Sequence, residues 1–541
     1  MRTHFDYIIV GAGSAGCVLA DRLSADGASQ VLLLEAGGRN EELMVRMPRG
    51  MVKIWAKPTW YWPFPAERQG ERPAGETWYY GKGLGGSSAV NGTWYFRGQP
   101  RDFDAWEAQG NKGWNWAQIE RCYRELEDYR GTPGGYSQRG RRGPMQVTEV
   151  PRGDAALTGA LLEAARQAGI PVHADVNTPG TQVAGRTQQT VDARGNRVTA
   201  YTAFLGHARN RANLTILTGA LVRRVTFEGK QATGILAQVD GREVAFTATR
   251  TILTAGVLQT PKLLQLSGIG PAAVLARHGI EVVHENPHVG RNMNEHMMVA
   301  LSWRLNKARG LNHQFRGWRA YMHGLRYILG GKGLMASLLP EVSVMASVES
   351  DPDWPDLQIG ISPYSMAQSE DDKPEAGRGE TEKRPGITAT AFCLRPNSHG
   401  YVEIASTDPA APPRLVPQWF SAPEDRVTIQ RAMRKVREVM AQPALAAYVG
   451  EETVPGPSVQ SDEEIQKAAN WLVSTGLHGT GTCRMGPDAA DSVVDGGLRV
   501  HGVRGLYVAD CSAMPTAISG NTNGPAIAFA WRAAEVISSE A

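Results

Sequence analysis

Residues 5–16 read FDYIIVGAGSAG, and residues 17–25 continue as CVLADRLSA. The first six residues are a short apolar run rich in β-branched side chains, which is typical of a buried strand, whereas CVLADRLSA has helical spacing. A second apolar run, VLLLEAG, follows at residues 31–37. This order predicts a strand, a turn, a helix and a second strand at the start of the chain.

Gly11, Gly13 and Gly16 have the spacing of the dinucleotide-binding fingerprint. The first glycine permits the tight turn, the second lets the backbone approach a pyrophosphate, and the third lets helix and strand pack closely. The N–H groups that begin the helix then face the phosphates, and Glu35 ends the second strand where a carboxylate can bind a ribose. The predicted nucleotide contacts of this unit are Gly11, Gly13, Ser14, Ala15, Gly16, Glu35 and Ala36. These features do not distinguish FAD from NAD, and a glycine-rich turn beside a surface glutamate is the alternative.

Length and composition narrow the classes of protein. A chain of 541 residues with 42% hydrophobic and 21% charged residues is expected to form two or more globular domains. The 57 Lys and Arg nearly balance the 54 Asp and Glu, for a net charge of +3, which argues against a general nucleic-acid binder. The basic stretch at 130–144, RGTPGGYSQRGRRGP, is predicted to be a surface loop.

Five widely spaced cysteines without a CxxC pair make a disulfide framework or a zinc site unexpected, and we expect no metal. The chain has no apolar stretch long enough to span a bilayer and no secretory pattern at its start, which favours the cytoplasm. A loose peripheral association with a membrane stays open. The segment from about residue 301 to 331 is amphipathic and carries many arginine and aromatic residues.

Several further segments resemble the glucose–methanol–choline (GMC) oxidoreductases. Residues 81–98, GKGLGGSSAVNGTWYFRG, are similar to the first signature of that family, and residues 255–270, AGVLQTPKLLQLSGIG, to the second. VGRNMNEH at 289–296, LHGTGTCRMG at 477–486 and GNTNGPAIAFAWRAAE at 520–535 resemble later segments. The matches keep their order along nearly the whole chain, and the likeness is greatest to the branch of choline and alkanol dehydrogenases. One departure is Val257, where a small residue is usual.

The resemblance implies FAD as the cofactor. Some relatives attach FAD covalently through a histidine just before the asparagine of the first signature; here that position is Val90, so we expect non-covalent FAD. The further FAD contacts that the resemblance implies are Gly83, Gly86, Ser87, Asn91, Gly92, Val222, Ala255, Asp510, Cys511 and Asn523.

The resemblance also makes His478 the active-site histidine and Asn523 its partner. A neutral imidazole can take the hydroxyl proton of an alcohol while the carbon gives up a hydride, and an asparagine can hydrogen-bond the substrate oxygen. The helix predicted after Pro525 would direct its positive end at the ring of the cofactor. The expected reaction is oxidation of an alcohol, primary and aliphatic or aromatic, to an aldehyde or ketone.

The expected fold is α/β. A Rossmann-type FAD-binding domain is expected from residues 1–155, 205–305 and 468–541, and a substrate-binding domain with a mainly antiparallel sheet and flanking helices from 156–204 and 306–467.

Oxygen, a quinone or another small carrier could accept the electrons, and the motifs do not separate oxidase from dehydrogenase. Three alternatives stay open: a non-redox lyase of this fold, a light-driven decarboxylase, and a flavin-binding module without turnover.

Overall fold

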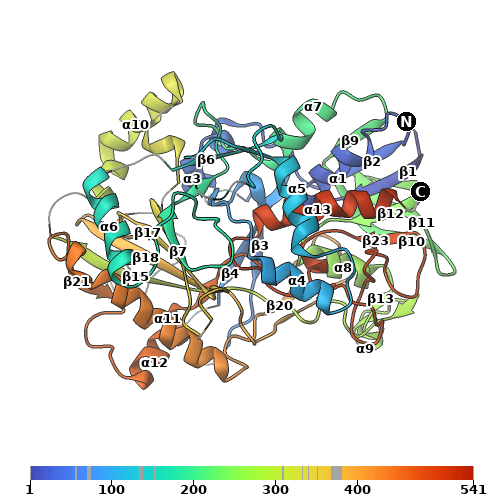
Figure 1. Cartoon of the computed structure of the whole chain (residues 1–541). Coiled ribbons are helices and arrows are strands. Elements are labelled where there is room, and N and C mark those ends of the chain that lie inside the picture. Colours follow the sequence, from blue (N-terminus) through green and yellow to red (C-terminus); the bar gives the residue numbers. More distant parts are fainter. Residues whose placement is uncertain are drawn as a thin grey trace.

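The computed structural model describes residues 2–54, 58–69, 75–132, 134, 136, 138–150, 154–306, 310–331, 333–338, 340–349, 351–366 and 381–539. Two seven-stranded sheets organise the chain, each with its own hydrophobic core and its own set of helices (Figure 1). This arrangement confirms the expected α/β class.

The first sheet is built around the strand that opens the chain. β1 (His4–Val10) pairs in parallel with β2 (Val31–Glu35) on one side and with β12 (Arg242–Leu253) on the other. All five residues of β2 are buried, as is usual for a parallel strand that is covered on both faces. The remaining strands are β9 (Leu214–Thr218), β10 (Ala220–Glu228), β11 (Gln231–Val239) and β23 (Leu506–Val508).

The C-terminal helix returns to the N-terminal unit. α1 (Ser14–Leu23) packs against α13 (Asn523–Ser538), which in turn packs against α5 (Trp116–Leu126) (Figure 1). α13 is apolar on nearly all sides, because it lies inside the core rather than on the surface. The two ends of the chain therefore form one packed layer, and the loop before α13 comes close to the glycine-rich turn.

The second sheet is antiparallel at every pair of its strands that the structure describes. Its order is β21 (Val449–Val454), β15 (Met297–Leu305), β18 (Gly386–Cys393), β17 (Leu357–Ser362), β16 (Val342–Ala346) and β7 (Val183–Arg186), with β22 (Ser474–Thr475) beside β15. This confirms the expected antiparallel sheet. β15 and β22 lie in stretches predicted for the FAD-binding part, yet they pair within this second sheet.

Side chains on alternate residues of these strands face opposite ways. On β18, Ile387, Ala389 and Ala391 pack in the core formed with α6 (Ala155–Gln167), α11 (Glu424–Met440) and α12 (Asp462–Leu472). Thr390 and Phe392 point the other way and line a cavity between the sheets. One face of the sheet thus serves stability and the other faces the site.

The remaining described helices and strands lie outside the two large sheets. The helices are α2 (Leu43–Arg46), α3 (Met51–Ile54), α4 (Pro100–Ala108), α7 (Gly206–Ala208), α8 (Gln259–Leu266), α9 (Ala272–Arg277) and α10 (Gly317–Gly330). The strands are β3 (Tyr61–Pro65), β4 (Thr77–Gly81), β5 (Glu127–Tyr129), β6 (Met145–Glu149), β8 (Gln188–Gln189), β13 (Ile269–Gly270), β14 (His284–Glu285), β19 (Tyr401–Glu403) and β20 (Arg414–Val416). Within the described ranges, no helix combines the length and the hydropathy needed to cross a membrane.

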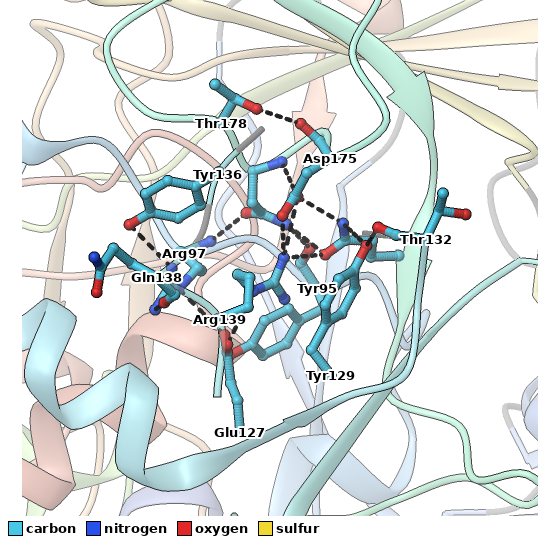
Figure 2. A network of polar contacts seen from close by, with 12 residues as sticks. Tyr95, Arg97, Glu127, Tyr129, Thr132, Tyr136, Gln138, Arg139, Asp175 and Thr178 are labelled. Carbon is cyan, nitrogen blue, oxygen red and sulfur yellow. Dashed lines mark hydrogen bonds and ion pairs between the residues drawn. The ribbon is translucent and has the colours of Figure 1, made fainter. Parts of the chain in front are cut away.

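A buried polar network joins segments from both predicted domains (Figure 2). The Arg139 guanidinium donates to Glu127 Oε2 at 3.0 Å and to both oxygens of Asp175 at 2.8 and 3.0 Å. Arg97 and the Tyr95 hydroxyl bind Glu127 Oε1 at 3.2 and 2.6 Å. The interpretation of residues 130–144 as a surface loop is therefore wrong for Arg139, because two carboxylates from distant segments draw its side chain into the interior.

Replacing Arg139 should destabilise the protein strongly. Arg139→Met leaves Glu127 and Asp175 buried without their common cation, which should lower the free energy of unfolding by about 3–5 kcal/mol. The matched control is Arg431→Met, because Arg431 forms an ion pair with Glu349 in which 49% and 52% of the two side chains are exposed, and such pairs contribute about 0–1 kcal/mol. Urea unfolding of both variants measures the difference. Equal midpoints for the two would contradict a stabilising role for the network.

Candidate active site

A cavity of about 560 Å³ extends from the glycine-rich turn after β1 to the face of the second sheet. This volume lies in the range of small-molecule and cofactor sites. Sixteen of the residues predicted to be functional line it: Gly11, Gly13, Ser14, Ala15, Glu35, Ala36, Gly86, Ser87, Asn91, Gly92, Val222, Ala255, His478, Asp510, Cys511 and Asn523. Gly16 and Gly83 are predicted contacts that do not line the cavity.

Backbone geometry explains why the turn after β1 needs glycine. Gly11 has a φ of +102°, which L side chains rarely adopt. A Cβ at Gly16 would lie 1.9 Å from the Gly11 carbonyl oxygen, so Gly16 serves the packing of α1 on the strand. Gly13 differs, because a Cβ there would meet only the Thr254 carbonyl oxygen, at 4.0 Å. The space beside Gly13 is therefore left open toward the cavity that this residue lines.

The Glu35 carboxylate ties three backbone segments together. Its Oε2 accepts the Ala12 N–H at 2.9 Å, and its Oε1 accepts the N–H groups of Gly37 and Gly83 at 2.8 and 2.9 Å. Gly83 thus acts behind the cavity wall, through Glu35. The sequence predicts only a ribose contact for Glu35, whereas the structure adds a scaffolding role.

Asp510 has a comparable arrangement at the end of β23. Its Oδ2 accepts from the Gly256 N–H at 2.8 Å and the Thr260 hydroxyl at 2.6 Å, while Oδ1 accepts the Ser512 N–H at 2.7 Å. Burial raises the pKa of this carboxyl group. Asp510 therefore fixes the loop before α8 against the C-terminal segment that leads to α13.

His478 lies at the end of the cavity nearest the second sheet, and its side chain is buried. Its Nε2 accepts from Asn521 Nδ2 at 2.9 Å, and Gln358 Nε2 donates to Asn521 Oδ1 at 2.8 Å, which fixes the asparagine amide. On the other side, His478 Nδ1 lies 3.0 Å from His296 Nδ1. Because Nε2 accepts, the neutral ring carries its proton on Nδ1, which donates to His296.

The protein keeps both histidines neutral. Desolvation, followed by the neighbouring His296, lowers the pKa of His478 well below 6.5. Desolvation lowers the pKa of His296 to about 3. A neutral imidazole can accept a proton through its one lone pair, here on Nε2, whereas an imidazolium cannot. The arrangement thus allows His478 to act as a base.

A carboxyl group holds the backbone of this loop. The His478 N–H donates to Glu295 Oε1 and Oε2 at 2.9 and 3.1 Å. Desolvation raises the pKa of Glu295 to about 8, although the His478 N–H and Thr475 act in the opposite direction. Glu295 therefore positions His478 through its main chain.

The hydrogen-bond partner of His478 is Asn521 rather than Asn523, the residue expected to act beside it. Asn521, two residues earlier, makes the hydrogen bond to His478, while Asn523 accepts from the Ser14 hydroxyl at 2.8 Å. The reason is local: Asn523 is the first residue of α13, and its side chain turns toward the start of α1. Asn521 still lies in the loop, where its side chain can reach across to the histidine.

Sequence reasoning assigned no role to Asn521, Glu295 or His296. Both asparagines stand in the same GNTNGP segment, and only the backbone path separates their roles. Glu295 and His296 belong to VGRNMNEH, a segment noted for its resemblance but given no function. The signal available was a pair of ionisable residues next to the start of an apolar strand, where burial alters pKa values.

The residues present fit FAD. Among the described residues, Asn523 Nδ2 is a buried donor without a hydrogen-bond partner, on a residue that lines the cavity. An acceptor on a bound cofactor would satisfy it. The N-terminal ends of α1 and α13 also line the cavity, so N–H groups from two helices face any negative charge there.

Comparison with known proteins agrees with this geometry. Residues 5–298 and 396–530 match the N-terminal and C-terminal domains described as GMC oxidoreductase. The chain belongs to the GMC oxidoreductase family. This confirms the expected class, an FAD-dependent oxidoreductase that acts on CH–OH groups.

Individual members of the family match along nearly their whole length. The oxygen-dependent choline dehydrogenase of Serratia proteamaculans (strain 568) is 35% identical over 98% of this chain and 95% of its own. An alcohol dehydrogenase [acceptor] of Pseudomonas putida is 36% identical over 98% of this chain and 95% of its own. The crystal structure of pyridoxine 4-oxidase from Mesorbium loti superimposes with a TM-score of 0.87 at 28% identity, covering 99% of each chain.

Gly13→Ala should weaken FAD binding without disturbing the apoprotein. The protein has room for the methyl group and a φ of −75° suits alanine, so only a ligand lying against Gly13 would meet it. Overpacking of this kind costs about 1–3 kcal/mol. FAD titration of the apoprotein measures the loss, with Gly38→Ala as control because its added methyl group meets open space. Equal affinities in both variants would place the pyrophosphate elsewhere.

Glu295 should make stability depend on pH. Its pKa is about 8 in the folded protein against an ordinary 4.5, so the folded state holds the proton through that window. The free energy of unfolding contributed by this group therefore falls as pH rises from about 4.5 to about 8. Relative to the wild type, Glu295→Gln should gain stability as pH rises from 5 to 8, as thermal unfolding can measure. The control is Glu451→Gln, an exposed carboxylate. A pH-independent difference would show that Glu295 is ionised throughout.

Proposed function

We propose that this protein oxidises a primary alcohol, aliphatic or aromatic, to the aldehyde, with His478 as the base that takes the hydroxyl proton. The observation that carries the proposal is the geometry at His478: a buried, neutral imidazole at the end of the cavity whose Nε2 is an acceptor. A hydride leaves an alcohol carbon readily only as the hydroxyl is deprotonated, so the reaction needs a base at this point.

We propose that FAD is bound without a covalent link. When bound, FAD supplies the hydride acceptor at N5 of its ring. The residues that would hold FAD are the predicted residues that line the cavity, with the exception of His478. Val90 supports a non-covalent attachment, because it lines the cavity at the position where some relatives carry the linking histidine and has no nucleophilic atom.

Side chains and backbone groups of the protein would move the proton and stabilise the developing charge. When the substrate hydroxyl takes the place of Asn521 Nδ2 at His478 Nε2, this nitrogen accepts the proton, and the proton already on Nδ1 stays on the side of His296. Asn521 Nδ2 donates to the substrate oxygen as charge develops on it, since Gln358 fixes the direction of that amide. The N-terminus of α13 presents backbone N–H groups beside Asn521 and Asn523, which stabilises negative charge in this part of the cavity.

The lining supports an alcohol with an apolar body. Trp62, Phe64, Leu338 and Phe392 lie on the cavity wall, and these side chains gain from covering an alkyl chain or an aromatic ring. We propose oxygen, a quinone or another small carrier as the electron acceptor. The Serratia relative is called oxygen-dependent, and the Pseudomonas relative is named for an unspecified acceptor.

Replacing His478 and the two asparagines separately tests these roles. His478→Ala should slow reduction of bound FAD by an alcohol by about 10²–10⁴-fold, because the base is lost. Asn521→Ala should slow it by roughly 10- to 100-fold, the value of a hydrogen bond to a charged group. Asn523→Ala serves as the matched asparagine variant, and its main effect should be on FAD retention because it loses the bond to Ser14.

Anaerobic stopped-flow absorbance measures the reduction, and the flavin spectrum measures FAD content. If Asn523→Ala slows reduction more than Asn521→Ala does, the assignment of Asn521 is wrong. Failure of every alcohol to reduce the flavin in the dark would instead favour a lyase, a light-driven decarboxylase or a flavin-binding module without turnover.

We also propose two properties of the whole chain. The first sheet, with α1 and α13, would bind FAD, and the second sheet, with its helices, would bind the substrate. β15 and β22 would belong to this second unit. Limited proteolysis that never separates the two units would contradict this division. The protein would work in the reducing cytoplasm, because its five cysteines are all free thiols. Fractionation of cells that places the protein outside the cytoplasm would oppose this.

A further inference from the structure

Helix α10 (Gly317–Gly330) turns an apolar face to solvent. Of the ten large apolar side chains that the described residues expose, six lie on this one helix: Trp318, Tyr321, Met322, Leu325, Ile328 and Leu329. Their exposed fractions run from 47% to 78%. Figure 1 shows α10 standing out from the body at the edge of the molecule. We refer to these six side chains as the docking face.

The docking face is continuous. At about 100° per residue, its six side chains fall within an arc of about 120° on one side of the helix. Tyr327 lies opposite and is buried in a small core with Met47 and Ala336, and its hydroxyl donates to Asn196 at 3.1 Å. The helix is therefore anchored by one face and leaves a broad apolar stripe uncovered. Single exposed apolar residues are common on protein surfaces, whereas a continuous stripe of this kind marks an interaction site.

The sequence segment that carries the docking face has charged residues of one sign. Residues 305–340 contain six Lys and Arg and no Asp or Glu, although the chain as a whole is nearly neutral. Arg319 and Arg326 are exposed, and helical geometry places both directly beside the apolar stripe. The Arg319 guanidinium lies 5.4 Å from the Trp318 ring.

This combination fits one partner best. We infer that α10 docks on a membrane surface that contains anionic phospholipid, with the apolar stripe among the acyl chains and the arginines at the phosphates. A stripe with tryptophan and leucine next to arginines is the pattern of helices that lie in the plane of a bilayer interface. A two-fold contact between copies is disfavoured, because it would bring the same arginines together without an acidic residue from this segment.

The anchored face of α10 connects it to the cavity. Met47 and Ala336, which pack on Tyr327, are followed closely in sequence by Met51 and Leu338, and both of these line the cavity. Docking through α10 would therefore hold this wall of the cavity near the bilayer. Membrane binding itself is measured without turnover, so it stands or falls separately from the proposed function.

Vesicle flotation with the full-length, FAD-loaded protein tests the inference. The wild type should bind vesicles of phosphatidylcholine with phosphatidylglycerol, and bind more weakly to phosphatidylcholine alone. Leu325→Asp with Leu329→Asp should lower binding to the anionic vesicles by about 10-fold or more, because two apolar anchors are lost. Arg319→Gln with Arg326→Gln should weaken binding and reduce its dependence on salt.

The matched control is Val282→Asp with Val427→Asp, two valines of 44% and 46% exposure outside α10, which should bind like the wild type. Light scattering during gel filtration tests the rival partner. A wild type that does not bind anionic vesicles, or a Leu325/Leu329 variant that binds them as well as the control, overturns the inference. A wild-type dimer that becomes a monomer in that variant, without vesicle binding, would make α10 a contact between copies.

Discussion

The proposed chemistry depends on one hydrogen-bonded row, Gln358–Asn521–His478–His296, which crosses the junction of the two sheets. Gln358 lies on β17 of the second sheet, and His296 immediately precedes β15 of that sheet. Asn521 lies in the loop before α13, a helix that packs with the first sheet. The position and protonation of the His478 imidazole therefore depend on both halves at once. Neither half alone would fix which nitrogen carries the proton.

Burial shifts the pKa values of the ionisable groups around this row in opposite directions, down for the histidines and up for Glu295. It favours the neutral form in each case, which keeps the two imidazoles unprotonated and keeps Glu295 protonated into the neutral range. A neutral base beside a neutral acid avoids leaving an uncompensated charge in the interior. The buried network around Arg139 uses the other solution, in which a cation is surrounded by two carboxylates and the amide oxygen of Gln188.

Much of the fold could be predicted from sequence because the deciding signals are local. The strand, turn and helix around Gly11, Gly13 and Gly16 follow from spacing within a short stretch, and the resemblance supplied the family. Features that depend on distant segments could not be predicted. Arg139 stands in a stretch that reads as a basic loop, and only Glu127 and Asp175 explain its burial. Asn521 and Asn523 are the same residue type in one short segment, and the position at which α13 begins determines which of them hydrogen-bonds His478. The amphipathic pattern of α10 was visible, yet the sequence does not say which face its neighbours leave open.

The rate of flavin reduction by an alcohol without oxygen, measured across pH, tests the central claim most directly. A desolvated His478 with a pKa well below 6.5 stays neutral in mildly acidic solution. We expect the rate to hold its plateau as pH falls through 6.5 and to decline only at lower pH. A rate that declines around pH 6.5, as for an imidazole in water, would contradict the neutral, desolvated base.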